Sequence, residues 1–188
     1  MKPAMILAIA LIIVAACFVA GFSLMQGGNT THMISGTQEL ALNAQDLQQL
    51  GMTSNADCQT EEQTSYSSQQ VQYSFCNYTI SSLNDTEVLL QLSKFTNLED
   101  LNGSYQYGSL HLYSIEGLIS ENVYGDQSRF RVNNVNDYGG EFNEPGVYYY
   151  HLWMCKDLYL IHITSGGRSQ EAGEYVTRIG QQILSKFG

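Results

Sequence analysis

The order of apolar and polar residues divides this chain of 188 residues into one long apolar run near its start and a series of shorter periodic segments. Ala4–Met25 holds 22 residues without a charged side chain, and roughly 20 apolar residues let a helix cross the hydrocarbon core of a bilayer. Lys2 precedes the run and no basic residue follows it closely, which orients the amino terminus toward the cytoplasm. The pattern predicts a single-pass anchor over residues 1–27, a spacer over 28–34 and an exported domain over 35–188.

Two other interpretations of the first segment stay open. A cleaved signal peptide has an apolar region of about 7–15 residues, shorter than this run. The letters VAAC place Cys17 where a lipoprotein would be lipidated, but the apolar stretch FVAGFSLM follows, where a lipid-anchored chain usually turns polar. All three interpretations place the rest of the chain outside the cytoplasm.

The shorter periodicities predict an α+β domain. Capping-box spacing over Ser35–Gln38 begins a helix that runs to about Leu50, and Gly51 is placed to end it. The other predicted elements are strands over 71–80, 87–95 and 129–135, an irregular helix over 96–107, a closing helix over 170–187, a turn at Asn84-Asp85, a loop or hairpin tip over 61–70, and an ambiguous stretch over 108–128. This order predicts one antiparallel sheet packed by helices.

The segment Tyr148–Thr164 (YYYHLWMCKDLYLIHIT) predicts a hairpin at the centre of the sheet. A two-residue turn at Lys156-Asp157 would place His151 opposite His162. Strand alternation then puts His151, Trp153, Cys155, Leu158, Leu160 and His162 on one face, and Tyr150, Leu152, Met154, Tyr159, Ile161 and Ile163 on the other. Both faces are largely apolar, which indicates a hairpin covered on both sides.

Charge and cysteine usage support export. Asp and Glu number 18 against 8 Lys and Arg, so the net charge of −10 disfavours nucleic acid and anionic lipid as partners. A Cys58–Cys76 disulfide would close a loop of about 19 residues and stabilise the domain by about 3 kcal/mol. Cys155 is then left over, although its pairing with Cys58 or Cys76 stays open. Candidate glycosylation sequons lie at Asn29, Asn77, Asn84 and Asn102.

Candidate chemistry is sparse, and the sequence predicts no cofactor and no metal centre. His151 and His162 are too few for a metal site, and the loop Asn133–Glu144 offers only weak calcium candidates, namely Asp137, Glu141 and Glu144. Motifs of nucleophilic enzymes and phosphate-binding loops are missing from the sequence. Aromatic and histidine side chains supply the best candidate binding surface, and its predicted residues are Tyr148, Tyr150, His151, Trp153, Tyr159 and His162.

Three stretches carry a resemblance to a known group of domains: YGDQSRF, YHLWMCKDLYLIHIT and EYVTRIGQQILSKF. They resemble exported α+β domains of uncharacterised prokaryotic lipoproteins and membrane-anchored proteins, whose fold is similar to the Mog1/PsbP-like α/β/α sandwich. The resemblance covers residues 35–188 in layout and 124–187 in motif. It implies an extracytoplasmic domain that acts in binding or assembly, and it implies no catalytic residues.

The sequence therefore predicts a single-pass membrane protein whose carboxy-terminal domain binds or assembles outside the cytoplasm and is not an enzyme. Its expected partners are the membrane, through the first helix, and a protein partner or a second copy of itself. One alternative is an enzyme that uses Cys155, His151 and His162. Another is a structural subunit of the cell envelope that associates through tyrosine surfaces.

Overall fold

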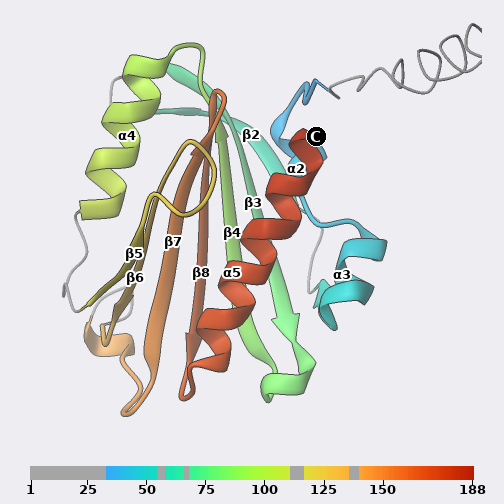
Figure 1. Cartoon of the computed structure of the whole chain (residues 1–188), viewed down its shortest axis with the longest axis vertical. Coiled ribbons are helices and arrows are strands. Elements are labelled where there is room, and N and C mark those ends of the chain that lie inside the picture. The colour runs from blue at the N-terminus through green and yellow to red at the C-terminus, as the bar shows by residue number, and fades with distance from the viewer. Residues whose placement is uncertain (1–32, 55–57, 66–67, 111–116, 136–139) are drawn as a thin grey trace, which may run out of the picture. The chain divides into compact units, whose positions relative to one another are not determined.

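One antiparallel sheet organises the computed structural model, which describes residues 33–54, 58–65, 68–110, 117–135 and 140–188 (Figure 1). The strand order is β1-β3-β4-β8-β7-β6-β5, and β2 also pairs with β3. The strands are β1 (Thr53–Ser54), β2 (Gln59–Thr64), β3 (Gln70–Ile80), β4 (Thr86–Lys94), β5 (Leu118–Glu121), β6 (Gln127–Asn133), β7 (Tyr148–Lys156) and β8 (Tyr159–Gly167). The predicted anchor, Cys17 and Asn29 lie outside the described residues. Within those residues, no helix combines the length and apolar character that crossing a membrane requires.

Helices pack on both faces of the sheet. Helix α4 (Leu98–Leu110) covers one face, named here the α4 face, through contacts with β7 and β8. The opposite face, the α5 face, packs against α5 (Glu171–Leu184), with α2 (Thr37–Leu40) and α3 (Ala44–Leu50) beside it (Figure 1). The described ranges also contain three short 3-10 turns: η1 (Ser81–Leu83), η2 (Gly140–Phe142) and η3 (Ser185–Phe187).

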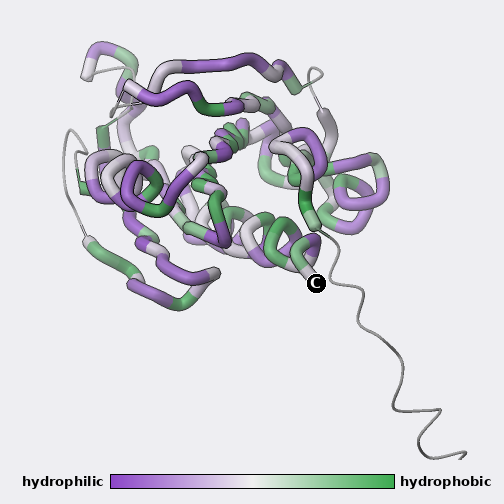
Figure 2. The backbone as a smooth tube through the Cα atoms, turned by 90° about the horizontal axis from the view of Figure 1, so that it is seen from above, coloured by the Kyte–Doolittle hydropathy of each residue, from purple (hydrophilic) through white to green (hydrophobic). Residues whose placement is uncertain are grey.

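The α5 face holds the larger apolar core. Helix α5 buries Ala172, Val176, Ile179 and Ile183, which recur at helical spacing. A Cβ on Gly173 would lie 2.8 Å from Cδ1 of Tyr150, so the helix backbone lies directly on the aromatic ring. Seen from above, apolar and polar segments alternate along the helices and strands around this core (Figure 2).

The α4 face holds a second, smaller core. It consists of Val71, Phe95, Leu101, Tyr105, Trp153 and Cys155, with Leu160 packed against it. Beside this core the α4 face carries polar side chains, which are described below.

The predicted α+β class, the strands around 71–80, 87–95 and 129–135 and the closing helix are confirmed. The turn at Asn84-Asp85 is confirmed as well, and both residues have positive φ angles of 56° and 57°.

The predicted continuous helix over residues 35–50 is wrong. It is interrupted after Leu40, because the Leu42 amide donates to the Tyr78 hydroxyl at 3.1 Å. A new helix begins with Asn43 as its cap: the Asn43 side chain accepts from the amides of Gln45 and Asp46. The capping box thus lies at Asn43 and Asp46 and not at Ser35–Gln38, whereas the predicted end at Gly51 is confirmed by its left-handed backbone, with φ of 67°.

The predicted loop over residues 61–70 is partly wrong, because Gln59–Thr64 forms strand β2 and pairs with β3. Backbone pairing and the adjacent Cys58–Cys76 disulfide hold this polar strand in place.

The predicted hairpin register is also wrong. Lys156 pairs with Tyr159, so the two-residue turn is Asp157-Leu158. Asp157 adopts a positive φ of 52°, and its amide donates to Asp126 Oδ2 at 2.8 Å. As a result, Trp153 faces His162 and His151 faces Thr164. The register is shifted by two residues, so every strand residue stays on its predicted face. The exception is Leu158, which lies in the turn.

Candidate functional site

A row of facing residues crosses the α4 face from strand to strand. Leu89 of β4 faces Thr164 of β8, Thr164 faces His151 of β7, and His151 faces Arg131 of β6. The next row, toward α4, contains Gln91, His162, Trp153 and Arg129. Polar side chains therefore occupy much of the α4 face beside its small apolar core.

The two histidines and Trp153 form a stacked cluster. The rings of Trp153 and His162 lie 4.2 Å apart with an interplanar angle of 6°, and the rings of His151 and Trp153 lie 5.2 Å apart. Helix α4 covers the indole closely, since a Cβ on Gly108 would lie 3.3 Å from Trp153 Nε1. Trp153 is consequently only 5% exposed and belongs to the core.

A chain of hydrogen bonds fixes the protonation of His162. Gln91 Nε2 donates to the Tyr73 hydroxyl at 2.9 Å, so Gln91 Oε1 lies toward His162 Nδ1, at 2.6 Å, and accepts its proton. His162 Nε2 is then an acceptor, with Thr164 Oγ1 at 3.0 Å and His151 Nδ1 at 3.3 Å. The network fixes the orientation of both rings.

Burial keeps both histidines neutral at neutral pH. Desolvation lowers the pKa of His151 to about 3. Desolvation, together with the neighbouring His151, also lowers the pKa of His162 well below 6.5. Neutral imidazoles in a buried network are suited to structural hydrogen bonding, and a proton from solvent would be costly to accommodate.

Two arginines on β6 have different surroundings. Arg129 donates through Nε to Glu121 at 2.8 Å and through Nη1 to Gln106 at 2.8 Å and Ser109 at 2.7 Å. Arg131, two residues later on the same face, is 9% exposed, and its Nε and Nη1 have no hydrogen-bond partner among the described residues. Asn133, which follows on the same face, is 1% exposed, and within the described ranges both polar atoms of its side chain lack a partner.

A cavity of about 680 Å³ lies at the end of the sheet remote from α4. Thr164 and Leu89, from the row described above, form part of its wall, together with Tyr149. Its charged lining residues are Asp85, Glu87, Glu144 and Arg168, and Arg168 Nη2 lies 3.5 Å from Glu144 Oε2. Further apolar wall is supplied by Leu83, Phe142 and Val147. The lining thus combines apolar surface with an excess of carboxylates.

The six residues predicted as a binding surface are divided between the two faces. His151, Trp153 and His162 come together on the α4 face. Tyr150 and Tyr159 belong to the core of the α5 face, where the Tyr159 hydroxyl donates to the Ile34 carbonyl at 2.9 Å. Tyr148 is 45% exposed at the start of β7. The tyrosines therefore do not extend the histidine cluster.

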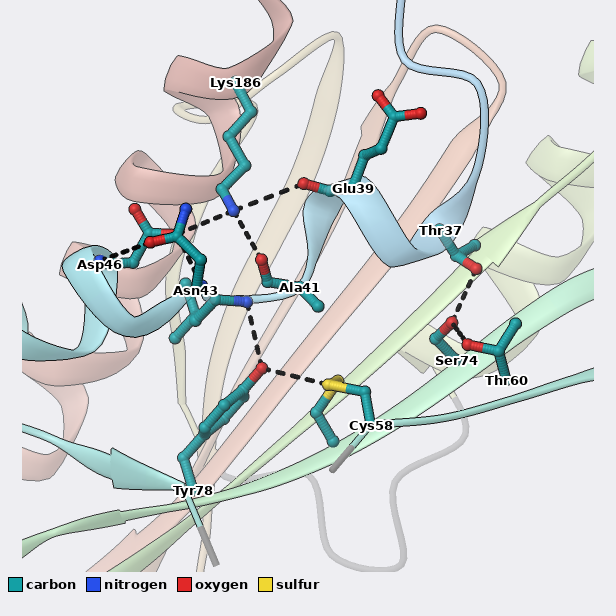
Figure 3. Close-up of a disulfide and its surroundings, with 12 residues drawn as sticks. Thr37, Glu39, Ala41, Asn43, Asp46, Cys58, Thr60, Ser74, Tyr78 and Lys186 are labelled. Atoms are coloured by element: carbon teal, nitrogen blue, oxygen red, sulfur yellow. Dashed lines mark hydrogen bonds and ion pairs between the residues drawn. A yellow bond between two sulfur atoms is a disulfide. The ribbon is translucent and has the colours of Figure 1, made fainter. Parts of the chain in front are cut away.

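The predicted Cys58–Cys76 disulfide is present and joins the start of β2 to β3 (Figure 3). Beside it, the Tyr78 hydroxyl lies 3.4 Å from Cys58 Sγ and also binds the Leu42 amide. Cys155 is a free thiol, 1% exposed, and burial raises its pKa to about 12. A structural disulfide is typical of proteins in oxidising compartments outside the cytosol.

The remaining candidate residues occupy varied positions. Among the sequons in the described ranges, Asn84 is exposed, Asn77 donates to Glu87, and Asn102 accepts from Gln127 Nε2 at 2.7 Å. Of the calcium candidates, Glu141 is exposed, Glu144 pairs with Arg168, and Asp137 lies outside the described residues. Searched over those residues, the chain contains no group of three or more His, Cys, Asp or Glu side chains arranged to hold a metal ion.

The sequence analysis did not single out Arg131, Asn133, Thr164 and Gln91. A signal for the first two was available: Arg129, Arg131 and Asn133 alternate with apolar residues in the predicted strand RFRVN. If that strand is covered on both faces, its polar positions must be buried.

Comparison with known proteins establishes no family. No model of a known protein family matches the sequence, and no curated protein matches it either. Among solved structures, the extracellular domain of PknH from Mycobacterium tuberculosis is similar, with 12% identity and a TM-score of 0.45 over 78% of this chain and 93% of that one. A likeness of this degree carries no functional conclusion, and the Mog1/PsbP-like resemblance remains a prediction.

Proposed function

We propose that the chain is a membrane-anchored, extracytoplasmic binding module whose cavity takes a small organic cation with an apolar body. The cavity of about 680 Å³ is the observation that carries this proposal, because ligand pockets in proteins commonly enclose roughly 300–1,000 Å³. The Cys58–Cys76 disulfide supports a location outside the cytosol. The apolar run Ala4–Met25 supports the anchor.

Charge supports a cationic ligand. Asp85, Glu87 and Glu144 line the cavity, whereas Arg168 is its one basic residue among those described and is already close to Glu144. The net charge of −10 also raises the local concentration of cations around the protein. Leu89, Phe142 and Tyr149 offer the surface that an apolar or aromatic body would contact.

The experiment compares three small probes of the same shape by saturation-transfer NMR on the full-length protein. 2-Phenylethylamine is cationic, 2-phenylethanol is neutral and phenylacetate is anionic. We expect the amine to bind most tightly. Leu89→Trp, which fills the cavity, should weaken its binding at least about tenfold, which corresponds to 1.4 kcal/mol.

Leu118→Trp is the matched control, because Leu118 is a 48% exposed residue of β5 that does not line the cavity. This variant should bind the amine as the unmodified chain does. Equal binding of phenylacetate and the amine would contradict the cationic ligand. Unchanged binding in Leu89→Trp, or no saturation transfer to any of the three probes, would contradict the cavity as the site.

The enzyme alternative receives less support from the site. A catalytic thiol must form a thiolate, and burial raises the pKa of Cys155 to about 12. The register also places Cys155 opposite Leu160 rather than opposite a histidine. We therefore propose a non-catalytic role for this face.

Assembly is the second candidate function, and exposed apolar residues at one edge of the sheet support it. Leu118, Ile119 and Val123 are 48%, 47% and 63% exposed on or beside β5, the last strand in the sheet order. An edge strand with apolar side chains can pair with the same strand of a second copy. Sedimentation velocity of the full chain should then show self-association that Ile119→Lys abolishes; a monomer at all concentrations would contradict it.

A further inference from the structure

Arg168 links two segments that line the cavity of the proposed function. Strand β7 begins beside the end of β8, because Tyr148 pairs with Gly167 (Figure 1). The residue that follows β8 therefore lies close to the residues that precede β7. Arg168 Nη1 donates to the Pro145 carbonyl at 2.6 Å, and Arg168 Nη2 lies 3.5 Å from Glu144 Oε2. Both Arg168 and Glu144 line the cavity.

A tight turn before β7 presents the acceptors that Arg168 uses. The Val147 amide donates to the Glu144 carbonyl at 3.1 Å, and Gly146 has a φ of 76°. Proline in the second position and a positive φ in the third are typical of a type II turn. Because the hydrogen bond of the turn uses the Glu144 carbonyl, the Pro145 carbonyl is available to a donor from another segment. The turn thus holds the Arg168 guanidinium beside the Glu144 carboxylate.

The two contacts of Arg168 differ in strength. The hydrogen bond to the Pro145 carbonyl is short, whereas the 3.5 Å separation from the Glu144 carboxylate exceeds the usual distance of an N–H···O hydrogen bond. The side chains of Arg168 and Glu144 are 65% and 69% exposed. Water screens an ion pair at such a position, so the pair stabilises the fold only slightly. A cation that enters the cavity can therefore displace the guanidinium from Glu144 at little cost.

The guanidinium of Arg168 also marks where a cationic group of a ligand would bind. Ammonium and guanidinium groups both carry a positive charge and donate N–H bonds, so they select the same carboxylate acceptors. Glu144 already has such a group beside it. Glu87, a second carboxylate of the lining, accepts instead from the uncharged amide of Asn77. Within the lining, Glu144 is thus the carboxylate that best fits a ligand cation.

We propose that Glu144 binds the cationic group of the ligand and that Arg168 competes with the ligand for this carboxylate. The inference rests on the proposed function and deepens it, since it names the residue that selects a cation and the residue that limits its affinity. A ligand must open the Arg168–Glu144 pair, so its apparent affinity is reduced by the fraction of molecules in which the pair is closed. A neutral ligand of the same shape meets no such competition.

NMR titrations of the full-length protein with 2-phenylethylamine and 2-phenylethanol test the competition. The ratio of the two affinities isolates the cation, because the probes share the same apolar body. Arg168→Met should raise this ratio about threefold, as expected if a typical exposed pair is closed in about two thirds of the molecules. Arg178→Met is the matched control and should leave the ratio unchanged, since Arg178 is an exposed arginine over the Tyr175 ring and does not line the cavity. An unchanged ratio in Arg168→Met, or the same rise in Arg178→Met, would overturn the competition.

The role of Glu144 has its own test. Glu144→Gln should lower the ratio about fivefold, whereas Glu87→Gln, the same change at another carboxylate of the lining, should lower it less than about twofold. Equal losses would overturn the assignment to Glu144. In a protein that already carries Glu144→Gln, Arg168→Met should no longer raise the ratio, because the carboxylate for which the two cations compete is gone. A rise of the same size in that background would overturn the competition.

The failure of this inference is distinguishable from the failure of the proposed function. Amine binding that Leu89→Trp weakens, together with an unchanged ratio in Arg168→Met and in Glu144→Gln, would overturn this inference and leave the cavity as the site. Lack of binding by the amine and the alcohol alike would overturn the proposed function, and this inference with it.

Discussion

Acid should destabilise the domain through its buried histidines before its carboxylates titrate. His151 is 0% exposed, and burial lowers its pKa to about 3. In the unfolded chain its pKa returns to about 6.5. Between these two values the unfolded state binds a proton that the folded state does not, so falling pH favours unfolding. The contribution of His151 to the free energy of unfolding is at its maximum above about pH 6.5 and decreases progressively as the pH falls toward 3.

The size of the effect follows from the difference between the two pKa values. Each pH unit below the unfolded pKa removes about 1.4 kcal/mol. With a folded pKa of about 3 for His151, the loss between pH 7 and pH 5 is about 2 kcal/mol. The lowered pKa of His162 adds to the loss in the same direction. Asp46 and Asp126 have pKa values below 3.8 and stay ionised in this interval, so they do not contribute to it.

Urea denaturation at pH 7 and pH 5, at constant ionic strength, measures the loss. The same pair of measurements on His151→Gln isolates the histidine, because every other titrating group is common to both proteins. Whatever the stability of the variant at pH 7, its decline between the two pH values should be about 2 kcal/mol smaller. Equal declines in the two proteins would refute the reasoning, as would a stability that does not change with pH.

Three further substitution sets test the packing. Replacing Cys58 and Cys76 by Ser should lower the free energy of unfolding by about 3 kcal/mol in urea denaturation; an unchanged midpoint would show that the disulfide contributes little. Lys186→Ala leaves the Asp46 carboxylate, 7% exposed and 2.8 Å from Lys186 Nζ, without its cation, and should destabilise by about 3 kcal/mol, against less than about 1 kcal/mol for Lys156→Ala at the more exposed Asp126 pair. Similar losses at the two pairs would contradict the role of burial. Gly103→Ala in α4, where a Cβ meets nothing within 4 Å, should raise the Tm, whereas Gly125→Ala, at a φ of 61° with its Cβ against the Cys155 carbonyl, should lower it; the same sign at both positions would be inconsistent with this packing.

Local patterns were sufficient to predict much of the fold. Apolar alternation identified β3 and β4, and the spacing of Val176, Ile179 and Ile183 identified α5. These signals are local because each strand or helix buries one of its faces, and that face leaves an apolar periodicity in the element's own sequence. The alternation of side chains along a strand also assigned the paired hairpin residues to the correct faces, although the predicted register was shifted by two residues.

The errors arose where distant residues decide the local structure. The first helix ends because Tyr78 binds the Leu42 amide, and no window around residue 42 contains that information. The hairpin turn lies at Asp157-Leu158 because Asp126 accepts the Asp157 amide. Strand β2 has no apolar alternation and depends on its backbone pairing with β3. The candidate binding surface mixed residues from both faces, because its members were chosen by aromatic and histidine composition and not by the face that strand alternation assigns to each of them.

The segment that opens the domain is held by residues that come much later in the chain. Tyr159, 125 positions later, binds the Ile34 carbonyl, and Lys186, 145 positions later, binds the Ala41 carbonyl. Neither bond can form before the chain has been synthesised as far as Tyr159 and Lys186. The first residues of the domain therefore gain these two contacts only after nearly all of the sheet has been made. Their attachment reports on completion of the whole domain.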